Sequence, residues 1–163
     1  MKIEQLTSDE AERLRAIRLR SLRDAPRAFA STFEQTAAQP PESWRQQLRD
    51  LATFVAVSEG QDVGIVRGAA PGVVPGAPPD LAMLISMWVA PEARGKGVGG
   101  ALVDAVIDWA RAQGLTRVRL EVVDDNAPAI ALYARKGFVQ TGPSVRCAPP
   151  REHLREHERT LEL

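Results

Sequence analysis

The stretch PEARGKGVGGAL, residues 91–102, follows an apolar run and precedes an amphipathic segment. It places glycines at positions 95, 97, 99 and 100 and basic residues at 94 and 96. Glycine loses more backbone entropy on folding than any other residue and weakens a helix. Four glycines at the start of a predicted helix therefore indicate that something approaches this backbone closely.

The residues on either side of this loop predict a strand, a turn and a helix. LAMLISMWVA, residues 81–90, is almost continuously apolar, which is typical of a central buried strand. Downstream, Leu102, Val106 and Trp109 recur at helical spacing, and Gly114 ends that helix. Beyond it we expect a strand at 115–123, a short helix at 127–136, a strand starting at 138–141 and a last strand through 160–163.

The N-terminal half predicts a strand at 2–6, a capping box formed by Thr7 and Glu10, and then an amphipathic helix. The arginines of that helix, at 13, 15, 18, 20 and 23, are expected mostly to face solvent. Next come a proline-bounded loop at 24–44 with a short helix, a helix at 41–50, two strands within 51–68 joined by a turn at 59–62, and an exposed hairpin tip at 69–80. This order predicts one mixed α/β domain over residues 1–163.

Composition excludes several classes of function. The chain has 21 basic and 21 acidic residues, so no net field favours nucleic acid or an anionic membrane surface as a partner. Its one cysteine, Cys147, forms no intramolecular disulfide and fits a reducing compartment. The first twenty residues lack an apolar signal core, and no run approaches 18 apolar residues. We expect a soluble, cytoplasmic protein, either a monomer or a homodimer.

Four interpretations of the glycine loop can be compared. Gly95, Gly97 and Gly100 match the dinucleotide-binding pattern GxGxxG, and Glu121 stands about 20 residues on, where a ribose hydroxyl would be bound. Against that pattern, the four residues 91–94, including a proline and two charged side chains, separate the predicted strand from the first glycine. A Walker loop fails because no Ser or Thr follows Lys96. The third interpretation is a glycine-rich turn without a ligand, although open N–H groups at a helix start form an anion site by geometry.

A two-part pattern favours a fourth interpretation. SMWVAPEARGKGVGGAL resembles the coenzyme A loop of the GNAT superfamily of N-acetyltransferases, with Arg94, Gly97 and Gly99 at the pattern positions. NAPAIALYARKGF, residues 126–138, resembles the second half of that superfamily. The resemblance is close from about residue 81 to 142. It implies a mixed, mainly antiparallel sheet flanked by helices, and acetyl transfer from acetyl-CoA to a primary amine.

The resemblance also implies roles for individual residues. Main-chain N–H groups of Gly95, Lys96, Gly97, Val98, Gly99 and Gly100 would bind the pyrophosphate, with Arg94 and Lys96 adding positive charge. Main-chain groups near Met87 and Val89 would pair with the pantetheine arm like an added strand, after a bulge has splayed the strand from its neighbour. Asn126 and Ala129 would contact the cofactor nearer its acyl end. Tyr133 would protonate the departing thiolate as the catalytic acid.

The acceptor side is less specified by the sequence. Phe33 and Glu34, in the proline-bounded loop, are candidates for binding the amine, with Glu34 attracting a cation. The expected strand at 81–90 carries no carboxylate, only Ser86, so the general base is not identified; Glu121 or a water chain remain open. His153 and His157 lack a third ligand, and we expect no metal. A non-catalytic acyl-CoA sensor and a nucleotide-binding oxidoreductase stay as alternatives.

Overall fold

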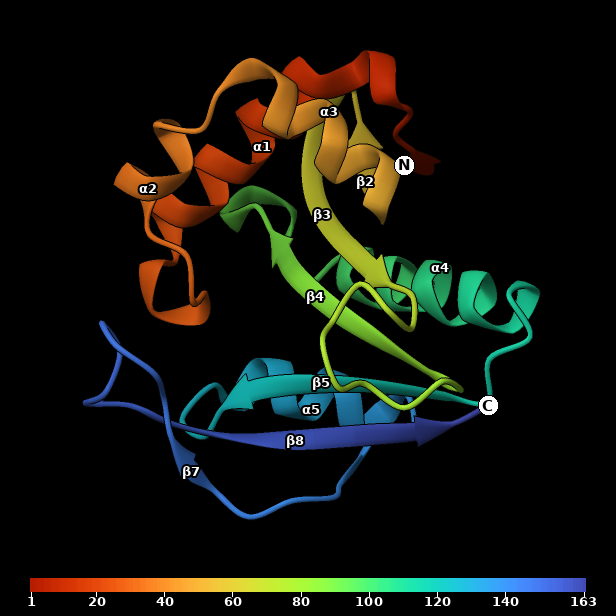
Figure 1. The fold of residues 1–163 in the computed structure, drawn as a ribbon. Helices are drawn as coiled ribbons and strands as arrows, with labels where there is room; N and C mark the ends of the chain where they lie inside the picture. The colour runs from red at the N-terminus through yellow and green to blue at the C-terminus, as the bar shows by residue number, and fades with distance from the viewer.

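A computed structural model describes residues 1–163, in which a twisted eight-stranded sheet carries helices on both faces (Figure 1). The strands are β1 (Lys2–Gln5), β2 (Leu51–Ser58), β3 (Gln61–Ala69), β4 (Leu81–Val89), β5 (Arg117–Val123), β6 (Val139–Gln140), β7 (Val145–Arg146) and β8 (Arg155–Glu162). The α-helices are α1 (Ala11–Asp24), α2 (Phe33–Ala37), α3 (Pro41–Asp50), α4 (Val98–Ala112) and α5 (Ala127–Arg135). Three single 3₁₀ turns are η1 (Ser8–Glu10), η2 (Pro26–Ala28) and η3 (Pro91–Ala93).

The sheet is antiparallel except where β4 meets β5. The strand order is β1-β2-β3-β4-β5-β8-β6, and β7 also pairs with β8. β4 and β5 are parallel neighbours only over Leu81–Met83 and Arg117–Arg119. Beyond that point they diverge, and Figure 1 shows the V that opens toward the end of β4. The mixed, mainly antiparallel sheet predicted from the sequence is therefore confirmed, with its opening beside the glycine loop.

A bulge in β4 accompanies this divergence. The β3–β4 register pairs Ile65 with Trp88 and Arg67 with Ile85, so two residues of β4 oppose one of β3. Ser86, in the bulge, has a φ of 59°, a left-handed conformation that few residues other than glycine adopt. The extra residue bends β4 away from β5, which is the splayed strand that the resemblance implied.

Two glycines of β3 allow α4 to lie close against the sheet. A Cβ on Gly64 would come within 2.9 Å of Leu102 Cδ1, and one on Gly68 within 2.6 Å of the Trp109 ring. Leu102 is fully buried in the main core cluster, and Trp109 packs against that cluster. This close packing sets the distance of α4 from the sheet, and therefore the position of its N-terminus relative to the opening.

Most elements match the sequence-based expectations. The capping box of Thr7 and Glu10 is present, although it opens the 3₁₀ turn η1 immediately before α1. α3 has the predicted bounds, and a two-residue turn at Glu59 and Gly60 joins β2 to β3. No helix is both long and apolar enough to cross a membrane.

Two expectations were wrong, and one short strand was missed. The last strand begins at Arg155 rather than near 160, because it pairs with β5 along that strand's whole length although its first residues are mostly charged. The short strand β7 was not predicted from its sequence. Arg18, expected to be solvated, is buried with 4% of its surface exposed, because its position on α1 faces the sheet beside Ile17 and Leu22.

Candidate functional site

A cavity of about 660 Å³ occupies the opening between β4 and β5. Its walls come from β4, the glycine loop and first turn of α4, the C-terminal part of β5, α5, and the chain at the end of α1 through η2. A volume of this size and a mostly apolar wall are usual for a small-molecule site. The sequence-predicted residues that line it are Met87, Val89, Arg94, Gly95, Gly97, Val98, Gly99, Gly100, Asn126, Ala129 and Tyr133.

Three predicted site residues do not line this cavity. Lys96 lines a second, smaller cavity on the other side of the loop, together with Glu59 and Glu92. Phe33 lies under the guanidinium of Arg23, 4.8 Å from its ring centre, at the start of α2. Glu34 is exposed in the same short helix. The structure therefore gives no geometric support to the cofactor role of Lys96 or to the amine-binding role of Phe33 and Glu34.

The first turn of α4 presents unpaired N–H groups to the cavity. Gly97 is the N-cap residue, and no side chain caps the helix. The first bond of the helix runs from Ala101 N to Gly97 O, so Val98, Gly99 and Gly100 have no acceptor within the helix for their N–H groups. No acidic side chain stands in this turn. The partial positive charge of the helix start is thus available to an anion.

Glycine occurs in the loop for two different structural reasons. Gly95 and Gly97 have φ values of 73° and 80°, and a Cβ on either would meet nothing within 4 Å. Their role is the left-handed backbone that turns the chain into the helix. Gly99 differs, because it lies close to other side chains: a Cβ there would lie 3.0 Å from Leu132 Cδ2 and 3.3 Å from Met87 Cε, so these side chains would have to shift to admit it.

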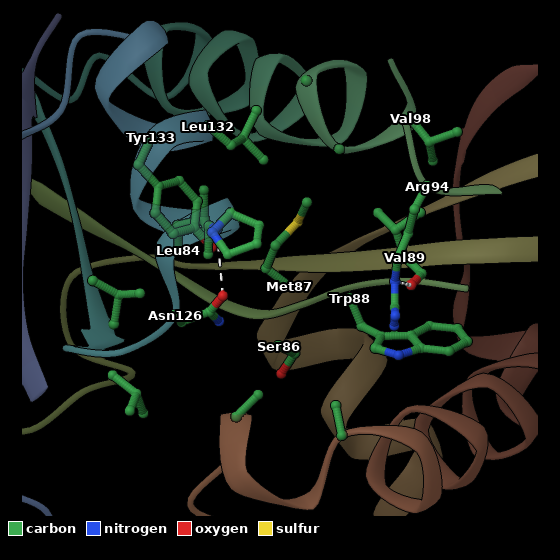
Figure 2. Close-up of a pocket in the computed structure, with 18 of the residues that line it drawn as sticks. Leu84, Ser86, Met87, Trp88, Val89, Arg94, Val98, Asn126, Leu132 and Tyr133 are labelled. Carbon is green, nitrogen blue, oxygen red and sulfur yellow. Dashed lines mark hydrogen bonds between the residues drawn. The ribbon is translucent and has the colours of Figure 1, made fainter. Parts of the chain in front are cut away.

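Side chains of β4 alternate between the two faces of the sheet within the cavity. Met87 and Val89 approach Gly99 on the α4 side. Trp88 faces α1, where its indole N–H donates to Asp24 Oδ2 at 2.9 Å. In Figure 2, Ser86 and Met87 point to opposite sides of the strand. The cavity therefore passes through the sheet, with a glycine-loop end and an opposite end at Ser86 and Phe29.

Tyr133 stands in the cavity wall on α5. It is 5% exposed, and its ring packs edge-on against Phe138 with 5.9 Å between ring centres. Burial raises the pKa of Tyr133 well above its usual value, and no charged neighbour contributes to the rise. The hydroxyl is therefore fully protonated at neutral pH and able to donate a hydrogen bond. Asn126, at the start of the same helix, accepts from Ala129 N at 3.4 Å and acts here as its cap.

Arg94 joins the glycine loop to α1. Its Nη2 donates to Asp24 Oδ2 at 2.6 Å. Its Nε donates to the carbonyl of Val89 at 3.0 Å (Figure 2). The hydrogen bonds from Trp88 and then Arg94 lower the pKa of Asp24, which keeps this carboxyl ionised. The sequence predicted a phosphate contact for Arg94 and overlooked Asp24, because the two residues stand 70 positions apart and nothing local relates them.

Two further groups mark the opposite end of the cavity. Ser86 Oγ accepts a hydrogen bond of 2.9 Å from Nε of the buried Arg67. Glu121 lines the same cavity from β5, and partial burial, followed by the charges of Glu156 and Glu158, raises its pKa. Arg67 was missed by the sequence analysis, although a charge inside the strand sequence VGIVRGA is a signal that could have found it.

The histidines do not form a metal centre. His157 lies on β8 and contacts Asp124 Oδ1 through Nδ1 at 2.7 Å, while His153 is exposed in the preceding turn. The structure has no cluster of three metal-ligating side chains.

Comparison with known proteins identifies the family. A sequence model of the Acetyltransferase (GNAT) family matches residues 17–138. Because this match spans most of the chain, the protein belongs to that family. Solved structures agree in fold: the chain has a TM-score of 0.83 with a GNAT-family acetyltransferase from Streptococcus pneumoniae, at 22% identity over 99% of this chain and 98% of that one. The TM-score is 0.77 with ribosomal-protein-alanine N-acetyltransferase from Brucella melitensis, at 23% identity over both complete chains.

Curated relatives are similar over shorter segments. The chain is 41% identical to streptothricin acetyltransferase of Streptomyces lavendulae over 57% of its length and 47% of that protein. It is 38% identical to human N-acetyltransferase 8 over 61% of its length and 43% of that protein. Mycothiol acetyltransferase of Pseudarthrobacter chlorophenolicus is 39% identical over 47% of this chain and 24% of that protein. The chain thus spans between a quarter and a half of these relatives.

Proposed function

We propose that this GNAT-family protein transfers an acetyl group from acetyl-CoA to a primary amine by direct attack, without a covalent enzyme intermediate. The observation that carries the proposal is the cavity that passes through the sheet, with an anion-binding helix start at one end and an opening beside α1 at the other. Donor and acceptor can then meet at the bulge of β4 from opposite faces.

The residues present fit the donor. The open N–H groups of Val98, Gly99 and Gly100 suit a pyrophosphate, because an uncapped helix start favours anions. Met87 and Val89, on the same face, offer apolar surface and the free edge of β4 for the pantetheine arm. The carbonyl of Val89 is held by Arg94, so this pairing requires Arg94 to give up that hydrogen bond. When bound, acetyl-CoA supplies an acetyl group activated as a thioester.

The protein's own groups would assist at two atoms of the reaction. The main-chain N–H near Val89 would donate to the acetyl carbonyl oxygen, where negative charge develops. Tyr133 Oη would donate its proton to the departing sulfur, because burial keeps the hydroxyl protonated and one face of the residue lines the cavity. A thiol pKa of about 8.5 makes the thiolate a tolerable leaving group that still benefits from a proton.

Glu121 is the candidate base on the acceptor side. Its raised pKa, caused first by partial burial, makes it a better proton acceptor than a carboxylate of ordinary pKa. It lines the cavity, whereas β4 offers only Ser86 there. A water chain to Glu121 would serve the same purpose for an amine that is not in direct contact.

The test is a screen of primary amines with acetyl-CoA, in which released CoA and the acetylated product are both measured. Wild type should release CoA only when an accepted amine is present. Tyr133→Phe retains the ring and should lower kcat by about 10²- to 10⁴-fold while leaving the dissociation constant of acetyl-CoA unchanged. A protein that does not bind acetyl-CoA, or a Tyr133→Phe rate within about threefold of wild type when chemistry limits the rate, would refute the corresponding part of the proposal.

A further inference from the structure

Two buried arginines lie on the α1 face of the sheet without an acidic partner. Arg18 of α1 is 4% exposed and Arg67 of β3 is 7% exposed. Arg13, by contrast, is a third exposed and pairs with Glu4, Glu10 and Asp62. The chain thus provides three carboxylates for a partly exposed arginine and no ion pair for the two buried ones.

The contacts of both guanidinium groups are with neutral groups. Arg67 donates from Nε to Ser86 Oγ at 2.9 Å and from Nη1 to Gln47 Oε1 at 2.8 Å. Arg18 donates from Nη1 to Ser21 Oγ at 3.4 Å and lies over the ring of Phe29, 5.0 Å from its centre. These contacts satisfy some N–H donors and leave the charge itself uncompensated.

Both side chains remain charged at neutral pH. Burial lowers the pKa of Arg18 to about 10, and burial together with the charge of Arg18 lowers that of Arg67 to about 9. The charge of Arg18 contributes to the lowered pKa of Arg67, so the two positive charges disfavour one another. Buried charges are costly when unpaired, and a bound anion would relieve both desolvation and repulsion.

The two arginines stand directly behind the acceptor end of the cavity. Ser86 and Phe29, which they contact, both line it. Ser86 Oγ receives its hydrogen bond from Arg67, so the hydroxyl proton remains free to be donated toward the cavity. Figure 2 shows Ser86 on the side of β4 opposite Met87, away from the donor face.

We propose that Ser86, backed by Arg67 and Arg18, binds the carboxylate of the acceptor, so that the substrate is a small primary amine that carries a carboxylate, of the amino-acid class. This inference rests on the proposed acetyl transfer and names its acceptor. Ser86 makes the direct contact, and the two arginines are positioning residues that supply the charge. Glu121, in the same cavity, is placed to receive the amino group of such a zwitterion. Cationic amines without an anionic group are poor substrates, because two buried positive charges repel them.

The first experiment compares matched acceptors. L-Amino acids, their carboxamides and their decarboxylated amines are assayed with acetyl-CoA, and kcat/KM is measured for each. The best amino acid should exceed its carboxamide by at least about 100-fold, since a site built for a polar group rejects the analogue that lacks it. Equal or better use of carboxamides and simple amines would overturn the proposal while leaving acetyl transfer intact.

Variants then distinguish an effect of the lost charge from an effect of disturbed folding. Arg67→Gln and Ser86→Ala should each lower kcat/KM for the amino acid by about 100-fold and change that for its carboxamide by less than about threefold. Arg67→Lys, which keeps the charge, should recover part of the loss. Arg15→Met is the matched control, because Arg15 is exposed on the same helix as Arg18. Equal losses for acid and carboxamide in Arg67→Gln would show a purely structural role.

A binding measurement tests the site without turnover. N-Acetylated amino acids, which keep the carboxylate, should raise the melting temperature of wild type and of Arg15→Met, and should not raise that of Arg18→Met or Arg67→Gln. Acetyl-CoA should still stabilise all four proteins. If N-acetylated amino acids stabilise the Arg67 variant as much as wild type, the carboxylate site is refuted; if acetyl-CoA stabilises none of them, the proposed function fails instead.

Discussion

Gly97 and Gly114 provide a matched pair of positions for testing the glycine loop. Both have a left-handed backbone, with φ values of 80° and 73°, and a Cβ on either would meet nothing within 4 Å. Gly97 is the N-cap of α4 and lines the cavity, whereas Gly114 follows its C-terminus. The helix has 15 residues and is therefore about 22 Å long. Alanine at either position brings the same backbone strain, and only one of the two positions is at the proposed phosphate site.

The expected magnitudes follow from that geometry. A residue with a Cβ in the left-handed region costs about 1 to 2 kcal/mol, which lowers the melting temperature of a chain of this size by roughly 2 to 8 °C in both variants. Acetyl-CoA at about 100 times its dissociation constant stabilises wild type by about 2.7 kcal/mol. If strain at Gly97 misaligns the N–H groups and weakens binding about 100-fold, the same ligand concentration stabilises Gly97→Ala by only about 0.4 kcal/mol.

The assay is thermal unfolding with and without acetyl-CoA at one ligand concentration. Gly114→Ala should show the full ligand-induced rise in melting temperature, and Gly97→Ala should show about a seventh of it. Equal rises in the two variants would refute the argument that the left-handed turn at Gly97 aligns the donors of the first helical turn. A circular dichroism spectrum identical to that of wild type confirms that each variant is folded.

Three further changes test other parts of the structure. Glu121→Gln should raise the melting temperature at pH 7.5 and leave it unchanged below about pH 4. The fold raises the pKa of Glu121, so ionisation of this carboxyl destabilises the folded state above its folded pKa and has no effect below the unfolded value of about 4.5. A gain in melting temperature that persists at pH 4 would contradict this cause. Asp24→Asn should lower the melting temperature at pH 7, and the difference from wild type should shrink as the pH falls below about 4. The fold lowers the pKa of Asp24, so the stabilisation by this carboxylate is lost when it is protonated. An unchanged melting temperature at pH 7 would show that the contact from Arg94 contributes no stability. Gly68→Ala should lower the free energy of unfolding by about 1 to 3 kcal/mol, since its Cβ would lie 2.6 Å from the Trp109 ring. The control is Gly142→Ala, whose Cβ would have no neighbour closer than 3.6 Å and which should change the free energy of unfolding little. Both are measured by urea titration.

The fold was largely predictable because its signals are local. A few neighbouring residues are enough to predict each of three elements: the strand at 81–89, the start of α4 from its glycines, and α5 from Pro128 and Gly137. The bulge at Ser86 was inferred only through the family resemblance, because serine gives no local sign of a left-handed backbone. The bounds of β8 were missed because the strand begins with five charged or ionisable residues, which elsewhere in the chain mark exposed loops and helix faces.

The geometry of the glycine loop was predictable for the same reason, and that of the cavity end at Ser86 was not. The main-chain donors of the glycine loop come from one continuous stretch, so their arrangement follows once the helix start is recognised. The proposed acceptor end is assembled from α1, β3 and β4, and its chemistry depends on which groups each side chain contacts there.

Arg18 illustrates the difference. It is one of five arginines on a single short helix, and its sequence neighbours do not distinguish it from Arg15. Helical geometry places Arg18 toward the sheet beside Ile17. An acidic residue on β3 would form an ion pair with it there, but β3 carries the positively charged Arg67 instead. A charge placed against a like charge in the interior gains nothing from the protein alone. We therefore expect the neutral double variant Arg18→Met with Arg67→Met to unfold at a temperature no lower than wild type in the absence of ligands, while losing its response to carboxylates.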